Sequence, residues 1–241
     1  AMEKDVIFET AERYVKATGR SVFLTGKAGT GKTTFLKYIT QTTSKRFVVL
    51  APTGVAAINA VGSTIHSFFQ LPLCPYLPDV KELVTEYQMP ERYRSLRKER
   101  VKIIRTLDLL IIDEISMVRA DMIDFVDKVL RIYSGNMREP FGGKQLLLVG
   151  DVFQLEPVVT SEMRPLLQRA YNQFFFFNAR AFKEVDIVSI ELKKIYRQTD
   201  SQFISILDRL RINRATKADL AVINNRYIKE TAEGDDDFVI T

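Results

Sequence analysis

The sequence contains very little cysteine and histidine. In 241 residues, Cys74 is the only cysteine and His66 is the only histidine. A single cysteine cannot form an intrachain disulfide, and a structural zinc site needs several cysteine or histidine ligands close together. These scarcities exclude a disulfide-stapled scaffold and a zinc cluster, and they favour a reducing compartment.

Long apolar runs are lacking as well. No segment approaches the roughly 20 consecutive apolar residues that a helix needs to cross a bilayer, and no charged-then-apolar leader opens the chain. We therefore expect a soluble protein with no membrane partner. Internal repeats and low-complexity tracts are also absent from the sequence.

What is present is a core-forming composition with a basic balance. Hydrophobic residues make up 46% of the chain, enough for one large core or two small ones. The net charge of +5 and the pI near 9.2 permit a nucleic-acid partner without requiring one.

Apolar runs alternate with helical patterns along the chain. Apolar residues recur at helical spacing over 121–133, which predicts a helix with one buried face. This alternation predicts an α/β fold, with a mostly parallel sheet and helices on both of its faces. The expected strands are 22–25, 47–51, 107–113, 145–150 and 187–192.

A glycine-rich segment follows the first expected strand and reads GKAGTGKTT. Its spacing matches a phosphate-binding loop, in which backbone N–H groups surround phosphate oxygens and a helix begins at Lys32. Lys32 is expected to reach the outer phosphates, and the Thr33 hydroxyl to bind Mg²⁺. The candidate nucleotide-binding residues are Gly26, Lys27, Ala28, Gly29, Thr30, Gly31, Lys32, Thr33 and Thr34.

Two further strand ends supply candidate catalytic residues. Asp113 and Glu114 follow an apolar strand, where Asp113 is expected to hold Mg²⁺ and Glu114 to orient or deprotonate water. Gln154, after the next strand, is the candidate sensor of the terminal phosphate. Arg197, after the last strand, is the candidate cation for the transferred phosphoryl group.

One more sequence pattern bears on whether the bound nucleotide is ATP or GTP. Residues 216–219 read TKAD and match a guanine-reading motif, but they open a helix instead of ending a buried strand. We interpret Thr216 and Asp219 as a capping box for that helix. The segment after Asp113 also lacks the Asp-x-x-Gly of GTP-dependent switches, so ATP is the expected nucleotide.

Two segments remain ambiguous from the residues alone. Residues 71–105 combine four prolines with a run of arginine and lysine, which predicts an inserted small subdomain with a basic helix. That helix is either a solvated face or a nucleic-acid contact. Residues 174–177 are four consecutive phenylalanines, for which packing in a core or between domains is favoured over base stacking.

Residues 51–57 (APTGVAA) and 62–68 (GSTIHSF) resemble the DNA-contacting segment of the Pif-type DNA helicases, relatives of the RecD-like branch of helicase superfamily one. Four other blocks agree with that resemblance, and 121–145 is similar to the signature segment of the family, including its Pro-Phe-Gly-Gly. The agreeing blocks are 26–34, 111–117, 150–158 and 196–198.

The resemblance implies an ATP- and Mg²⁺-dependent helicase that moves 5′ to 3′ along single-stranded DNA. Its partners would be single strands, single-strand to double-strand junctions, and G-quadruplexes or RNA–DNA hybrids. It implies that 1–70 and 106–241 form a first RecA-like domain, that 71–105 is a wedge-like insertion, and that a second RecA-like domain is absent. The implied DNA contacts are Thr53, Gly54, Val55, Thr64, His66 and Phe68, with His66 alternatively filling or capping a helix.

The resemblance has limits. No glutamine precedes the phosphate loop to read adenine, and Val152 and Glu156 stand where relatives often have Phe and Pro. Two rival hypotheses stay open: a ring-forming loader or recombinase that does not unwind DNA, and a nucleic-acid-binding module regulated by ATP. We expect a monomer. The expected location is a bacterial cytoplasm, at the nucleoid, because only a short stretch precedes the phosphate loop.

Overall fold

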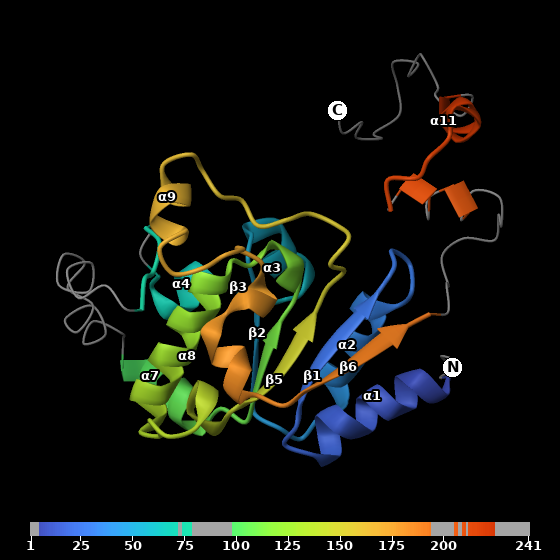
Figure 1. Cartoon of the computed structure of the whole chain (residues 1–241). Coiled ribbons are helices and arrows are strands. Elements are labelled where there is room, and N and C mark those ends of the chain that lie inside the picture. The colour runs from blue at the N-terminus through green and yellow to red at the C-terminus, as the bar shows by residue number, and fades with distance from the viewer. Residues whose placement is uncertain are drawn as a thin grey trace, which may run out of the picture. The chain divides into compact units, whose positions relative to one another are not determined.

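The computed structural model describes residues 5–71, 74–78, 98–193, 205–206, 209–210 and 212–224. The chain divides into two compact units, Ala1–Arg197 and Gln198–Thr241. The first unit contains the sheet and most of the helices (Figure 1). No helix in the described part of the chain has the length and apolar character that a membrane crossing requires.

The first unit is built on a six-stranded, all-parallel sheet with the order β3-β2-β4-β5-β1-β6. The α/β prediction is therefore confirmed. Five of the strands were expected from the sequence, with bounds that differ by no more than two residues. The strands are β1 (Ser21–Gly26), β2 (Phe47–Ala51), β3 (Ser63–Thr64), β4 (Leu109–Ile112), β5 (Gln145–Val149) and β6 (Ile187–Leu192).

Helices cover both faces of this sheet, and each face has its own apolar core (Figure 1). Alternate residues of the central strand β4 point to opposite faces of the sheet. Leu109 and Ile111 pack in the first core, and Leu110 and Ile112 pack in the second. The first core lies under α1 (Val6–Ala17) and α2 (Lys32–Thr42). The second lies under α4 (Ile65–Phe69), α7 (Lys98–Thr106) and α8 (Ala120–Ser134).

Short elements complete the first unit around these layers. In the described part of this unit they are α3 (Gly54–Asn59), α9 (Met163–Leu167) and four short 3₁₀ helices. The 3₁₀ helices are η1 (Ile115–Met117), η2 (Pro140–Gly143), η3 (Phe176–Asn178) and η4 (Arg180–Glu184).

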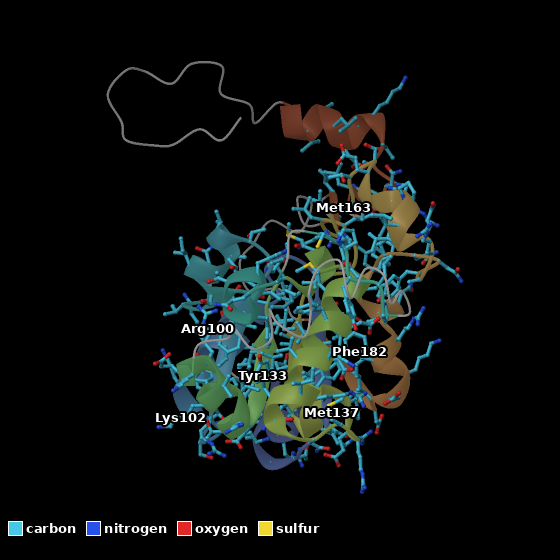
Figure 2. The ribbon with its side chains drawn as sticks, turned by 90° about the vertical axis from the view of Figure 1, so that its left-hand side faces the viewer. Arg100, Lys102, Tyr133, Met137, Met163 and Phe182 are labelled. Carbon is cyan, nitrogen blue, oxygen red and sulfur yellow. The ribbon has the colours of Figure 1, made fainter. Side chains whose placement is uncertain are left out.

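The predicted insertion lies largely outside the described residues. Its C-terminal part forms α7, which carries Arg100 and Lys102 on the surface shown in Figure 2. Ile104 of the same helix is fully buried in the core beneath α8, as is Leu77 of the preceding described segment. These residues belong to the core of the first unit, and the extent of a separate subdomain stays a prediction.

The second unit contributes α11 (Lys217–Asn224). The backbone N–H of Asp219 donates to Thr216 Oγ1 at 3.2 Å, and the backbone N–H of Thr216 donates to Asp219 Oδ2 at 2.8 Å. This reciprocal pair is a capping box, which confirms the interpretation of 216–219 as a helix start.

Candidate nucleotide and single-strand site

The phosphate loop connects β1 to α2 in the conformation that its glycines permit. Gly29 and Gly31 have φ of 80° and 93°, and Gly31 is the N-cap of α2. A Cβ on Gly26 would lie 2.5 Å from Thr30 Oγ1 and 2.6 Å from the Leu192 carbonyl oxygen. Glycine is therefore the residue that this position accepts, because the loop closes tightly over the ends of β1 and β6.

Two side chains hold the loop from inside. The Thr30 hydroxyl is buried and donates to the Lys27 carbonyl at 2.8 Å. The Lys32 ammonium donates to the Gly26 carbonyl at 2.6 Å and to the Lys27 carbonyl at 3.1 Å. The Lys32 charge is thus held within the loop at the start of α2, where a phosphate would meet it, while Thr33 is exposed in the first helical turn.

Asp113 and Glu114 follow β4 at the same edge of the sheet. The N–H of Asp113 donates to the Leu50 carbonyl at 2.8 Å, and the N–H of Glu114 donates to Asp113 Oδ1 at 2.9 Å. Glu114 has φ of 50°, a left-handed conformation that is costly for a residue with a side chain. This backbone turn changes the direction of the chain directly after Asp113 and sets where the Glu114 carboxylate lies.

The two carboxyls are electrostatically coupled to Lys32. Burial raises the pKa of Asp113, an effect that a hydrogen bond from Glu114 and the Lys32 charge oppose. Burial also raises the pKa of Glu114, with further increases from the Asp113 and Asp151 charges and an opposing effect of Lys32. A cationic ligand at this edge would relieve the repulsion between these carboxylates.

The residues fit a magnesium ion that is held together with a nucleotide. In the described part of the chain, no three Asp, Glu, His or Cys side chains form a metal-binding group of their own. Mg²⁺ commonly takes only one or two protein ligands and completes its shell with phosphate oxygens and water. The Thr33 hydroxyl and the Asp113 carboxylate are such a pair, so their donor chemistry suits the predicted role.

The end of β5 adds a residue that we did not predict as part of the site. Asp151 is fully buried, and its Oδ1 accepts from the N–H of Phe153 at 3.1 Å. Its carbonyl accepts from the N–H of Gln154 at 3.0 Å, which fixes the turn that carries the exposed Gln154. The available signal was an acidic residue two positions after the end of a fully buried strand. Arg197 lies outside the described residues and stays a prediction.

The segment that follows β2 lies at the same edge of the sheet as Asp113, because β2 pairs with β4 in a parallel register. Thr53 caps α3 by accepting from the N–H of Ala56 at 3.2 Å, and Thr64 caps α4 by accepting from the N–H of Ser67 at 3.1 Å. Gly54 has open space around its missing side chain, and Val55 is 72% exposed. Backbone and small side chains are thus accessible along this edge, as binding to a phosphate backbone requires.

His66 and Phe68 differ in their exposure. His66 is half-buried, and burial together with the Arg119 charge lowers its pKa, against an opposing effect of Asp121. Phe68 is only 7% exposed and packs edge-on against Phe69, with ring centroids 4.9 Å apart. Because little of the Phe68 ring is accessible to a base, we leave it out of the proposed DNA surface.

The fold and the site together define the class of protein to which this chain belongs. The sheet is all-parallel, a phosphate loop follows its first strand, and an Asp-Glu pair follows β4. These features identify a RecA-like P-loop nucleotide-binding protein. The family model for PIF1-like helicases matches residues 1–217. The chain therefore belongs to the PIF1-like helicase family.

Curated relatives agree with this assignment. The chain is 35% identical to ATP-dependent DNA helicase PIF1 of Saccharomyces cerevisiae (strain YJM789) over 218 residues, covering 87% of this chain and 23% of the yeast protein. It is 36% identical to the Homo sapiens protein of the same name over 204 residues, covering 82% of this chain and 28% of the human protein.

Solved structures agree as well. Bacteroides Pif1 bound to single-stranded DNA superposes with a TM-score of 0.84 at 38% identity, covering 96% of this chain and 52% of that one. The Bacteroides helicase in complex with ADP-AlF3 and single-stranded DNA superposes with a TM-score of 0.85 at 38% identity, covering 97% and 52%. The chain thus spans about half the length of these solved relatives and about a quarter of the curated ones.

Proposed function

We propose that this chain is a motor portion of an ATP-dependent DNA helicase that moves 5′ to 3′ along single-stranded DNA. One observation carries the proposal. The N–H of Asp113 donates a hydrogen bond to the carbonyl of Leu50, and Leu50 lies three residues before Thr53 in the sequence. The candidate metal ligand and the candidate DNA segment therefore share one edge of the sheet. The relatives solved with ADP-AlF3 and single-stranded DNA support both ligands.

Each nucleotide-site residue then has one task in phosphoryl transfer. The loop amides of 26–34 and the Lys32 ammonium bind the phosphates. Thr33 and Asp113 would hold Mg²⁺, which would supply positive charge to the phosphate oxygens. Glu114 accepts a proton from the attacking water, and burial, which raises its pKa, makes it a better proton acceptor. Gln154 and Arg197 are the proposed γ-phosphate sensor and transition-state cation.

The proposed DNA track runs over Thr53, Gly54, Val55 and Thr64, with His66 beside it. Exposed backbone and a residue without a side chain can follow a phosphate backbone without reading sequence. A neutral His66 imidazole can donate or accept a hydrogen bond from a base or sugar. The forked-DNA structure of a related Pif1 helicase supports strand junctions as substrates. G-quadruplexes, RNA–DNA hybrids, a monomeric state and a bacterial cytoplasmic location remain expectations.

The test is ATP hydrolysis by the chain with and without a short thymidine oligonucleotide. We expect the oligonucleotide to stimulate hydrolysis and Lys32→Ala to abolish it. Oligonucleotides with a streptavidin block at either end then test polarity, since 5′ to 3′ movement displaces streptavidin from the 3′ end. We expect this chain alone to hydrolyse ATP weakly or not at all, because it spans about half the length of the solved relatives. Tight oligonucleotide binding without hydrolysis by a protein of the relatives' full length would contradict the motor assignment and favour the binding module regulated by ATP.

A further inference from the structure

The segment 164–183 has a composition unlike the rest of the surface. It contains two arginines near its start, Arg180 and Lys183 near its end, and no aspartate or glutamate. Six of its residues are aromatic and four are asparagine or glutamine. Proteins bind single-stranded nucleic acid with basic, aromatic and amide side chains, and carboxylates would repel its phosphates. None of these residues belongs to the nucleotide site or to the proposed DNA track.

This segment is fixed firmly to α8. The buried Asp124 carboxylate accepts three hydrogen bonds: from the Tyr171 hydroxyl at 2.6 Å, from the N–H of Arg180 at 3.0 Å and from the N–H of Ala181 at 2.9 Å. The Phe174 carbonyl accepts from the N–H of Ala120 at 2.9 Å, at the start of α8. The geometry of the segment is therefore set by the core, as a pre-organised binding surface requires.

The four phenylalanines divide into core and surface. Phe176 is 4% exposed and packs against Phe23 of β1, with ring centroids 5.4 Å apart, so packing in the core is confirmed for this residue. Phe177 is 51% exposed. Its ring stacks on Phe175 with centroids 5.2 Å apart and planes 6° from parallel, and it forms a T-shaped contact with Phe176 at 5.3 Å between centroids. The Phe177 ring thus lies parallel to Phe175, and about half of the Phe177 side chain remains accessible to a ligand.

A pocket of about 730 Å³ opens beside this ring. That volume lies in the range of small-molecule sites and accommodates a nucleotide. Phe182 of η4 is part of its wall and lies beside α8 in Figure 2. The Arg180 guanidinium lies over the Tyr171 ring at 5.9 Å and donates to the Ala170 carbonyl at 3.3 Å, which holds it at the pocket. The groups available to a ligand are those of Asn172, Gln173, Phe177, Asn178, Arg180 and Lys183.

We propose that this pocket, which we call the Phe177 pocket, is a second binding site for single-stranded nucleic acid. One base stacks on the exposed part of the Phe177 ring, the amides of Asn172, Gln173 and Asn178 bind base edges, and Arg180 and Lys183 attract the flanking phosphate. The one acidic residue of the lining, Glu184, is paired with Arg131 at 3.0 Å, which reduces its repulsion of a phosphate. Stacking accepts any base, so the site has no strict sequence preference.

Photo-crosslinking separates this site from the proposed DNA track. A thymidine oligonucleotide carrying 4-thiothymidine is crosslinked to the full 241-residue chain, and mass spectrometry locates the modified peptides. We expect adducts within 171–184 in addition to any near Thr53. In Phe177→Ala the affinity measured from the 171–184 adduct should fall roughly 5- to 150-fold, the range for losing one base–aromatic stack. Phe177→Tyr, which keeps a ring, should restore it.

Val6→Ala is the control, because Val6 is an exposed apolar residue on α1, outside the Phe177 pocket, and its loss should leave the adduct unchanged. Circular dichroism confirms that each variant is folded. Absence of adducts in 171–184 at saturating oligonucleotide, or an unchanged yield in Phe177→Ala, would overturn the proposal, as would use of this face by a protein partner alone. Lys32→Ala separates the Phe177 pocket from the nucleotide site. If this variant loses ATP hydrolysis but keeps the 171–184 adducts, the Phe177 pocket binds the oligonucleotide whether or not the motor assignment holds.

Discussion

Asp113 donates its backbone N–H to the carbonyl oxygen of Leu50 at 2.8 Å. The bond extends the pairing of β4 with β2, so the candidate metal ligand at the end of one strand is tied to the strand that leads into Thr53. A shift of Asp113 upon nucleotide binding would therefore be transmitted by backbone bonding to the proposed DNA segment. Rigid secondary structure that contacts both sites is a physical route for coupling between them.

The Glu114 carboxylate should govern hydrolysis more than binding. In Glu114→Gln, we expect the ATP hydrolysis rate to fall by roughly 10²- to 10⁴-fold, because the amide cannot accept the proton of the attacking water. Affinity for Mg²⁺·ATP should change little, as measured by isothermal titration calorimetry. Glu156→Gln, in which an exposed carboxylate of the neighbouring loop is removed, is the control. Parental hydrolysis in Glu114→Gln would refute the assigned role.

The closure of the phosphate loop depends on Gly26. In Gly26→Ala the new Cβ would overlap Thr30 Oγ1 and the Leu192 carbonyl oxygen, so the loop must shift. We expect a loss of about 1–3 kcal/mol in the free energy of unfolding, together with weakened nucleotide binding. Gly19→Ala, where a Cβ meets nothing within 4 Å, should preserve both properties. Equal urea-unfolding curves for Gly26→Ala and Gly19→Ala would show that a Cβ at position 26 does not overlap Thr30 Oγ1 or the Leu192 carbonyl.

The Arg46–Asp108 pair should stabilise the fold in a defined pH range. The Arg46 guanidinium lowers the pKa of Asp108 from 3.8 to about 2. A carboxyl with a lower pKa in the folded state stabilises it above the unfolded pKa, and that contribution is lost as the pH falls towards 2. The stability difference between the parent and Asp108→Asn should therefore narrow between pH 4 and pH 2 in urea titrations. Both side chains are partly exposed, so the difference should be small and should shrink in salt.

The only histidine gives an unambiguous NMR signal for the predicted DNA segment. Burial and the Arg119 charge lower the pKa of His66 below its ordinary value of 6.5. We expect the imidazole to titrate below that value and to shift upwards in Arg119→Met, which removes the positive charge and leaves Asp121 nearby. Arg138→Met, a change at an exposed arginine, should have no such effect. A His66 pKa above 6.5 in the parent chain would mean that its surroundings are not those described.

Much of the site could be predicted because its signals are local. Glycine spacing specified the loop at Gly26, and an apolar run followed by two acidic residues located the end of β4. The two-residue strand β3 was missed because a strand so short has no alternation to detect. The burial of Phe68 was missed for a related reason: α4 has only five residues, too few for helical periodicity to show which side faces the core.

Other features depend on contacts between segments far apart in the sequence. The left-handed turn at Glu114 and the burial of Asp151 follow from how the ends of β4 and β5 approach each other. Gly150 permits this approach, since a Cβ there would lie 2.9 Å from the Ile115 side chain. The split of 174–177 into a buried Phe176 and an exposed Phe177 likewise depends on the packing against β1, which no local pattern specifies.

The measurement that tests the central claim most directly is the affinity of the chain for a short single-stranded oligonucleotide, with and without a non-hydrolysable ATP analogue and Mg²⁺. If the two sites are coupled through the Asp113 and Leu50 strand ends, the analogue should change DNA affinity by about fivefold or more. Lys32→Ala should abolish that change. Equal DNA affinity in the presence and absence of a bound analogue would contradict the account, because the two sites would then share an edge of the sheet without acting on each other.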